Sequence, residues 1–136
     1  MNNWLKGITA VGGSLITMLY GGWSELLTAL CIFMAVDFIT GWIASGIEGK
    51  LSSNVGFKGI ARKMSILLIV AMGHLMDNVL GTQNELFESA CIYFYLANEA
   101  LSIIENTTRM GLPIPDVLHK AIALVNKKAE EKEEKQ

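Results

Sequence analysis

The stretch LLTALCIFMAVDFITGWIASGI, residues 26–47, decides the fold class of this chain. It contains a single charged side chain, that of Asp37, among 22 residues. A helix rises about 1.5 Å per residue, so a helix of this length can cross the roughly 30 Å hydrocarbon core of a bilayer. The stretch therefore predicts a transmembrane helix and, with it, an all-α integral membrane protein.

The distribution of positive charge supports this prediction and also orients the chain. The 11 Lys and Arg residues lie in three places: Lys6, the stretch from Lys50 to Lys63, and the tail from Arg109 onward. The intervals 7–49 and 64–108 hold no cation. Because cations are costly in hydrocarbon and are retained in cytoplasmic loops, we expect segment 50–63 and the C-terminus to be cytoplasmic.

Two further apolar stretches, residues 64–80 and 86–104, are also expected to cross the membrane. The short connection between them, residues 81–85, carries only negative charge and should therefore face outward. The two spans then form a hairpin whose second helix returns the chain to the cytoplasm. Residues 1–110 are thus predicted to form a bundle of three to four transmembrane helices.

The number of spans depends on residues 7–23, which are apolar but short and interrupted by glycines. This segment fits a marginal span, a re-entrant segment or a helix in the membrane interface. If it crosses, there are four spans and both termini are cytoplasmic; otherwise there are three and the N-terminus is outside. We favour four, because Lys6 is close to the membrane and Trp4 and Trp23 bracket the segment like interfacial anchors. A cleaved signal peptide is less favoured, since no small-residue cleavage site precedes a polar domain.

The C-terminal part, residues 111–136, differs in character from the rest of the chain. Gly111, Pro113 and Pro115 interrupt any helix that continues from the membrane. Apolar residues then recur with helical spacing from Ile114, which predicts an amphipathic helix followed by a solvated run of Lys and Glu. We expect this cytoplasmic tail to lie on the inner leaflet or to pack on the cytoplasmic loop.

Asp37 lies near the middle of the clearest span, where an acidic side chain costs about 2.5–3.5 kcal/mol. Its helical face continues through Gly41 and Ser45, with small or hydrogen-bonding side chains that let another helix approach closely. This strip has two interpretations, and the sequence leaves both open. It could form a contact within a static bundle, or it could face another subunit or a water-filled lumen.

A polar stripe also runs along the third span. Its candidate residues for a subunit contact or a pore lining are Tyr95, Asn98, Glu99, Ser102, Glu105 and Asn106. Such a stripe is costly in lipid but acceptable in an oligomer, where it can be hidden before assembly and wetted afterwards. In the second span, Asp77 is a further candidate and shares a face with His74, so a local hydrogen bond between these two is possible. Two possible ligands do not make a metal site.

Several functional classes lack support in the sequence. It contains no Gly-rich phosphate loop, GxSxG, HExxH or Cys/His pair, so we expect no enzyme, no catalytic residues and no cofactor. The net charge of −2 argues against nucleic-acid binding. Cys31 and Cys91 both fall in apolar stretches without partners at metal-ligand spacing, so we expect reduced, buried thiols and no bound metal.

Three segments resemble the holins of the toxin-secretion and phage-lysis family. They are DFITG at 37–41, SSNVGFKGIARK at 52–63 and NEALSIIENTTRMGLPIPDVL at 98–118. The resemblance covers most of the chain between these limits, whereas the N-terminal third matches only in being apolar. It implies a phage or prophage product that accumulates in the host cytoplasmic membrane and forms lesions as a homo-oligomer. An endolysin, or a toxin without a signal sequence, would pass through these lesions.

Two other classes share many of these features. A small-ion channel subunit would also carry charged residues in its spans, although the chain shows no internal repeat of the kind seen in transporters. An antiholin, which restrains a holin partner, would share every feature described above. The sequence leaves the choice between holin and antiholin open.

Overall fold

A computed structural model describes residues 2–135 as five helices. The helices are α1 (Asn3–Tyr20), α2 (Glu25–Ile47), α3 (Ser53–Leu80), α4 (Leu86–Arg109) and α5 (Asp116–Glu134). No strand occurs in this part of the chain, so the all-α prediction is confirmed. The last residue of the predicted tail lies outside the described residues.

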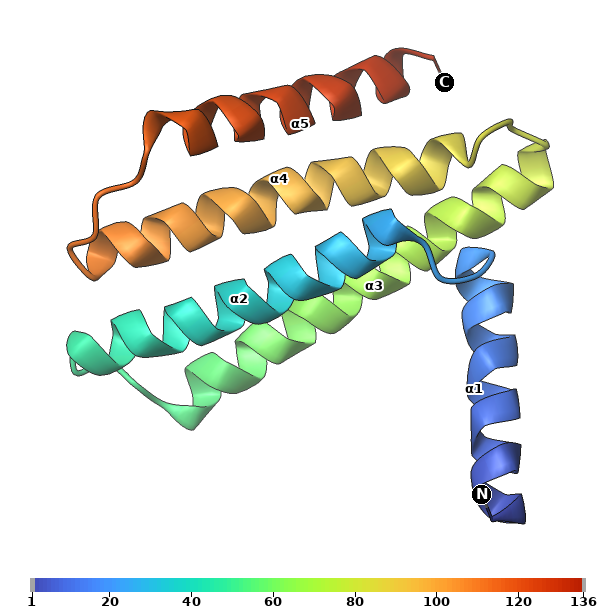
Figure 1. Ribbon diagram of the computed structural model, residues 1–136, viewed down its shortest axis with the longest axis horizontal. Helices are drawn as coiled ribbons and strands as arrows, with labels where there is room; N and C mark the ends of the chain where they lie inside the picture. Colours follow the sequence, from blue (N-terminus) through green and yellow to red (C-terminus); the bar gives the residue numbers. More distant parts are fainter. Residues whose placement is uncertain (1, 136) are drawn as a thin grey trace.

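The helices α2, α3 and α4 run alongside one another and form the body of the molecule (Figure 1). Their shared core is apolar, with Leu27, Leu30, Val70 and Ile92 almost fully buried. At Gly73, a Cβ atom would lie 3.1 Å from the Cα atom of Glu88 in the facing helix α4, so glycine permits the close approach of α3 and α4.

Short polar residues and glycines set the ends of these helices. The hydroxyl groups of Ser24 and Ser52 accept hydrogen bonds from the first turns of α2 and α3. Helix α3 ends at Gly81, whose φ of +65° suits glycine at a helix C-terminus. Residues 50–63 are expected to form a cytoplasmic loop, which is wrong for most of them. Residues 53–63 are the first turns of α3, because Ser52 caps the helix there.

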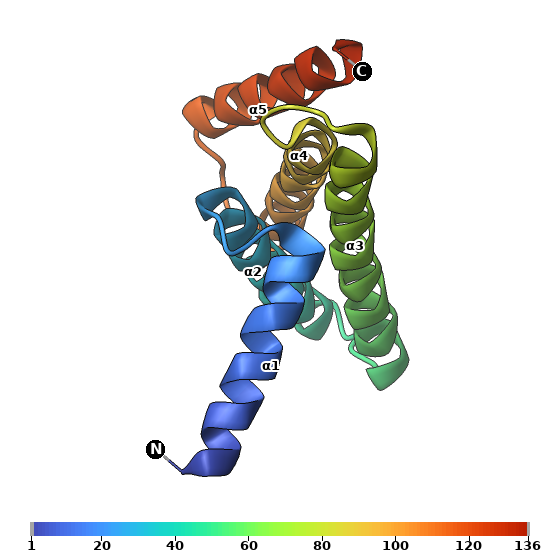
Figure 2. The same cartoon turned by 90° about the vertical axis from the view of Figure 1, so that its right-hand side faces the viewer.

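Helix α1 contacts the three-helix body only at its C-terminal end, where the Tyr20 hydroxyl donates a hydrogen bond to the Leu67 carbonyl oxygen at 3.0 Å. It projects from the end where α2 begins, across the direction of the other helices (Figure 1), and Figure 2 shows it extending freely from the body. None of its residues is buried. An apolar stripe on its surface is exposed and comprises Trp4, Ile8, Val11, Leu15 and Met18. The spacing of these residues places them along one helical face.

Helix α5 lies along α4 and runs antiparallel to it (Figure 1). Its Ile122 and Ala129 are buried in this contact. The predicted amphipathic helix is therefore present, but it does not pack on the cytoplasmic loop as one of the two expectations had it. It packs on α4 because that helix offers a long apolar side.

Among the described residues, one helix is long and apolar enough to cross a membrane by length and composition, namely α2. It coincides with the stretch 26–47 identified from the sequence. The spans expected at 64–80 and 86–104 lie within α3 and α4, whose polar residues lower their mean hydropathy. Their crossing of the membrane stays a prediction.

Candidate functional site: a polar seam and groove among three helices

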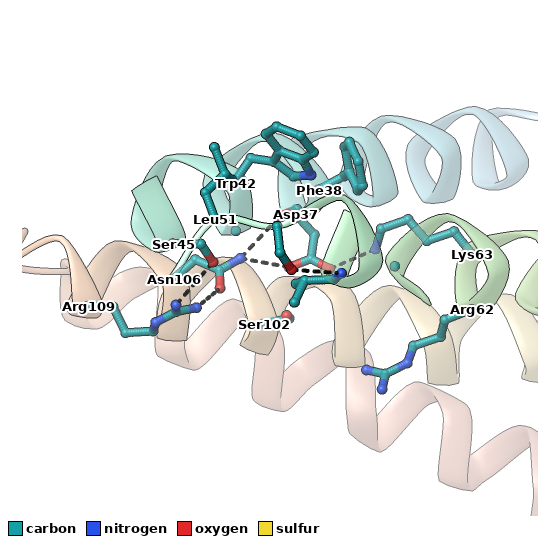
Figure 3. A pocket seen from close by; sticks show the side chains of 14 residues that line it. Asp37, Phe38, Trp42, Ser45, Leu51, Arg62, Lys63, Ser102, Asn106 and Arg109 are labelled. Atoms are coloured by element: carbon teal, nitrogen blue, oxygen red, sulfur yellow. Dashed lines mark hydrogen bonds and ion pairs between the residues drawn. The ribbon is translucent and has the colours of Figure 1, made fainter. Parts of the chain in front are cut away.

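One lysine is shared by two carboxylates in the middle of the body. The Lys63 ammonium lies 2.7 Å from Asp37 Oδ2 and 2.6 Å from Glu99 Oε2. The side chains of Lys63, Asp37 and Glu99 are only 16%, 13% and 6% exposed, respectively. One residue comes from each of α2, α3 and α4, so this triad ties the three helices together (Figure 3 shows Asp37 and Lys63).

The triad offsets the cost of placing the acidic side chain of Asp37 in the middle of the clearest span. Buried charges are tolerated when they are paired and hydrogen-bonded. Lys63 is not predicted as this partner, because its charge assigns it to a cytoplasmic loop. A signal was nevertheless present, since Lys63 directly adjoins the apolar stretch that begins at Met64.

Asn106 extends the polar contact between α2 and α4. Its Nδ2 donates to the carbonyl oxygen of Asp37 at 3.1 Å, to Asp37 Oδ1 at 2.9 Å and to Thr40 Oγ1 at 3.0 Å. A Cβ atom at Gly41 would lie 3.4 Å from the same nitrogen, so this glycine leaves space for the amide. We call Asp37, Lys63, Glu99 and Asn106, with Thr40 and Gly41, the polar seam.

The seam continues to the end of the body at which α5 begins. Arg109 Nε donates to Glu48 Oε1 at 2.8 Å, and its Nη2 lies 3.5 Å from the hydroxyl of Ser45 (Figure 3). The hydrogen bond from Arg109 lowers the pKa of Glu48, which keeps this exposed carboxyl group ionised. The strip predicted from Asp37 to Ser45 therefore contacts α4 of the same chain, which matches the interpretation as a contact within a bundle.

An open cavity of about 440 Å³ lies beside the seam, between α3 and α4. We call it the polar groove, and its polar lining includes Arg62, Tyr95, Asn98, Glu99, Ser102 and Glu105. The side chains of Arg62, Asn98 and Glu105 are exposed there. Five of the six residues predicted as a stripe on the third span thus line one groove, and the sixth, Asn106, belongs to the seam.

Asp77 lies apart from the seam and groove, near the other end of the body. Its carboxylate accepts hydrogen bonds from the backbone N–H of Phe87 at 2.8 Å and of Glu88 at 2.9 Å, and from the Thr82 hydroxyl. It therefore caps the first turn of α4 from α3. The hydrogen bond that the sequence allows between His74 and Asp77 does not form, because the backbone of α4 takes up this carboxylate.

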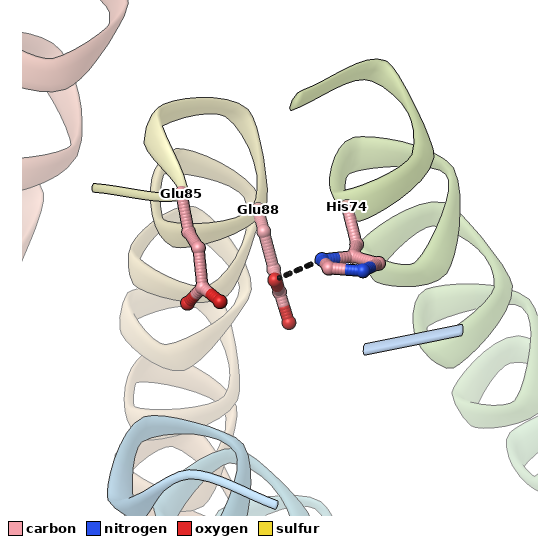
Figure 4. A group of neighbouring side chains, drawn as sticks. All are labelled: His74, Glu85 and Glu88. Atoms are coloured by element: carbon pink, nitrogen blue, oxygen red, sulfur yellow. Dashed lines mark hydrogen bonds and ion pairs between the residues drawn. The ribbon is translucent and has the colours of Figure 1, made fainter. Parts of the chain in front are cut away.

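His74 instead faces Glu88, with 3.0 Å between His74 Nδ1 and Glu88 Oε2 (Figure 4). Asn78 lies 3.2 Å from the other ring nitrogen. Glu85 stands nearby, and the donor atoms of His74, Glu85 and Glu88 all lie within 4.8 Å of one another, so these residues could hold a metal ion. The imidazole and the Glu88 carboxylate already satisfy each other, so no ion is needed to explain their burial.

The chain is similar in sequence to a known protein family and to several individual proteins. Residues 14–127 match the profile of the bacteriophage holin family. A protein of Listeria monocytogenes described as uncharacterized is 46% identical over 90% of this chain and 87% of its own length. A protein of Bacillus phage phi105 described as a probable holin is 31% identical over 82% of both chains. No solved structure matches the chain.

Proposed function

Because this chain belongs to the bacteriophage holin family, we propose that it oligomerises in the cytoplasmic membrane of a bacterial host and opens lesions there. Through these lesions a cytoplasmic endolysin, or a toxin without a signal sequence, reaches the cell wall. The family implies a membrane protein rather than an enzyme, and no catalytic step is part of the proposal.

The proposed topology has α2, α3 and α4 crossing the bilayer, with the α2–α3 connection and the start of α5 on the cytoplasmic side. Two observations support it. The clearest span ends at Ile47, beside the cationic segment, and cations favour the cytoplasmic side. The three helices also lie alongside one another, as crossing helices do (Figure 1).

For α1 we propose a position in the outer membrane interface rather than a fourth crossing, which gives three spans. It runs across the direction of the other helices, and its exposed apolar stripe suits a helix that lies in the plane of the headgroups. Trp4 and Trp23 near its ends are side chains typical of that interface. The sequence alone favours four spans on the position of Lys6.

The polar groove is the observation that carries the proposal. Arg62 directly precedes Lys63, whose ammonium contacts Asp37 near the middle of α2, so the groove lies at the depth of the hydrocarbon. An exposed guanidinium, amide and carboxylate at this depth cannot face lipid without a large cost. The polar groups of the groove must therefore contact either another copy of the chain or water.

We propose that the groove makes both contacts in turn. While the protein accumulates, the groove of one copy is covered by a neighbouring copy, which satisfies Asn98 and Glu105. When the lesion opens, the same residues line water and form part of its wall. The seam remains closed throughout, because its groups satisfy one another within one chain.

Release of a large cytoplasmic enzyme from expressing cells tests the proposal. A lesion-forming holin is expected to release β-galactosidase, whereas a small-ion channel would depolarise the membrane and retain the enzyme. An antiholin would do neither, and on co-expression it would delay lysis by a holin. Retention of the enzyme in cells that carry abundant protein in their membranes would contradict the holin role.

A further inference from the structure

Helix α5 covers an apolar side of α4 that faces away from the groove. The contact surrounds a cavity of about 230 Å³ lined by Phe33, Leu96, Ala100, Ile103, Ile104, Leu118, Ala121, Ile122 and Val125. None of these side chains carries a hydrogen-bonding group. The side of α4 that α5 occupies is therefore of the kind that lipid acyl chains contact in a membrane.

The charged end of α5 lies beside the predicted span in α4. Because α5 runs antiparallel to α4, Glu133 lines a cavity together with Phe87 and Cys91, near the start of α4. Lys128 and Lys132 stand over the ring of Tyr93, at 5.4 and 6.0 Å from its centroid. If α4 crossed the bilayer with α5 in this place, these Lys and Glu side chains would lie at the depth of the hydrocarbon.

Charged side chains in the hydrocarbon core are strongly disfavoured. The docked position of α5 and the crossing of α4 therefore exclude each other. The contact is also suited to release, because an open apolar cavity beside Ile122 leaves part of it without close packing. The connection 110–115 contains two prolines and a glycine with positive φ, which separate the two helices.

We propose that α5 is a displaceable cover for the lipid-facing side of α4. Before insertion, α5 shields this side from water; on insertion, lipid acyl chains take its place and α5 swings out to the cytoplasmic side. This inference rests on the proposed crossing of α4. A second copy fits this side less well than lipid, because the polar groups that need a protein partner lie on the groove side.

Disulfide trapping tests whether α5 leaves α4 when α4 crosses the bilayer. In full-length protein with Cys31→Ala, Glu133→Cys is placed to pair with the native Cys91 when α5 is docked. The matched control is Glu131→Cys, which is also exposed but lies about 200° away around the helix. Each protein is synthesised in a cell-free system, with or without vesicles of phosphatidylethanolamine and phosphatidylglycerol, and then oxidised with copper phenanthroline.

A parallel sample, with Gln83→Cys as the sole cysteine, reports whether the connection between α3 and α4 has reached the vesicle lumen, where an impermeant maleimide cannot label it. Without vesicles, we expect a disulfide between Cys91 and the thiol introduced by Glu133→Cys. We expect at least a tenfold loss of this disulfide in the carbonate-resistant vesicle fraction, and little disulfide from the control in either sample.

The outcomes separate this inference from the topology on which it rests. An undiminished disulfide in vesicles where residue 83 is protected would show that α5 stays docked on a crossing α4, which overturns the inference and leaves the topology intact. Absence of the disulfide without vesicles would also overturn it, because α5 would not be docked. Labelling of residue 83 in the vesicle sample would reject the crossing itself, and the inference with it.

Discussion

The ammonium group of Lys63 lies 2.7 Å from the carboxylate of Asp37, although charge patterning alone assigns the first to the cytoplasm and the second to the membrane interior. This ion pair fixes the position of α3 along α2. It brings Lys63, and with it Arg62, to the middle of the body, where the polar groove opens. In the proposed lesion, the pair thus determines which residues can form the wall.

Lys63→Met is expected to destabilise the protein strongly, because it leaves Asp37 and Glu99 as neighbouring buried carboxylates without a cation. Removal of one partner from a buried ion pair typically costs about 3–5 kcal/mol. Lys58→Met removes an exposed lysine from the same helix and should have little effect. The stabilities of the two variants would be compared by thermal unfolding in detergent and by the amount of protein in membranes. Equal stability of the two variants would show that the triad is not structural.

Asn98→Leu is expected to delay or abolish lysis while the protein accumulates normally. The substitution removes a polar group from the groove and makes α4 more compatible with lipid. The matched control is Gln83→Leu, which replaces an exposed amide in the connection between α3 and α4. Lysis curves recorded beside membrane quantification would decide the matter. Unchanged timing at unchanged abundance would mean that the groove does not line the lesion.

Asn98 is a better choice than Glu99 for this test. The sequence pattern suggests Glu99 as the main polar group of the stripe, but its carboxylate is bound to Lys63 and is almost fully buried. Replacement of Glu99 would disturb the seam as well as the groove. A lysis defect in that variant would therefore not distinguish between the two.

Gly41→Leu should lower the amount of folded protein, because the added side chain meets Asn106 of the same chain. Overpacking of this kind usually costs about 1–3 kcal/mol. Gly46→Leu, on the same helix, enters open space and should be tolerated. The comparison is made by crosslinking and by membrane quantification. If Gly41→Leu accumulates normally but fails to crosslink, the strip is a contact between copies after all.

Ile122→Asp is expected to bring lysis forward, because it places a charge in the contact between α5 and α4 and so favours release of the cover. Leu124→Asp introduces the same charge on the exposed side of α5, where it should leave the timing unchanged. Lysis onset at matched expression is the measurement. Identical onset in both variants would show that docking of α5 does not restrain insertion.

Topology can be checked by labelling single cysteines from outside intact cells. The three-span arrangement predicts labelling at Gln83 and at Asn3, and protection at Ser53. Labelling at Gln83 with protection at Asn3 would instead support a crossing by α1 and four spans. Strong labelling at Ser53 would reject both arrangements, since the cationic segment would then face outward.

The sequence predicts the helical class, the span at 26–47, the amphipathic character of residues 116–134 and the polar side of α4, because each follows from local periodicity or charge. It does not predict which polar groups meet. Lys63 lies 26 residues from Asp37 and 36 from Glu99 along the chain, and periodicity carries no information about such pairings. The side of α4 on which α5 packs could not be predicted for the same reason.

Helix α3 is unbroken from Ser53 to Leu80, and it carries both Lys63 of the seam and His74, which faces Glu88. At about 1.5 Å per residue, their separation of 11 positions amounts to roughly 16 Å of rigid helix. An axial displacement of α3 that separates Lys63 from Asp37 must also draw His74 away from Glu88. The Lys63–Asp37 pair and the His74–Glu88 pair are therefore coupled through α3, so a disturbance at one of them is transmitted to the other.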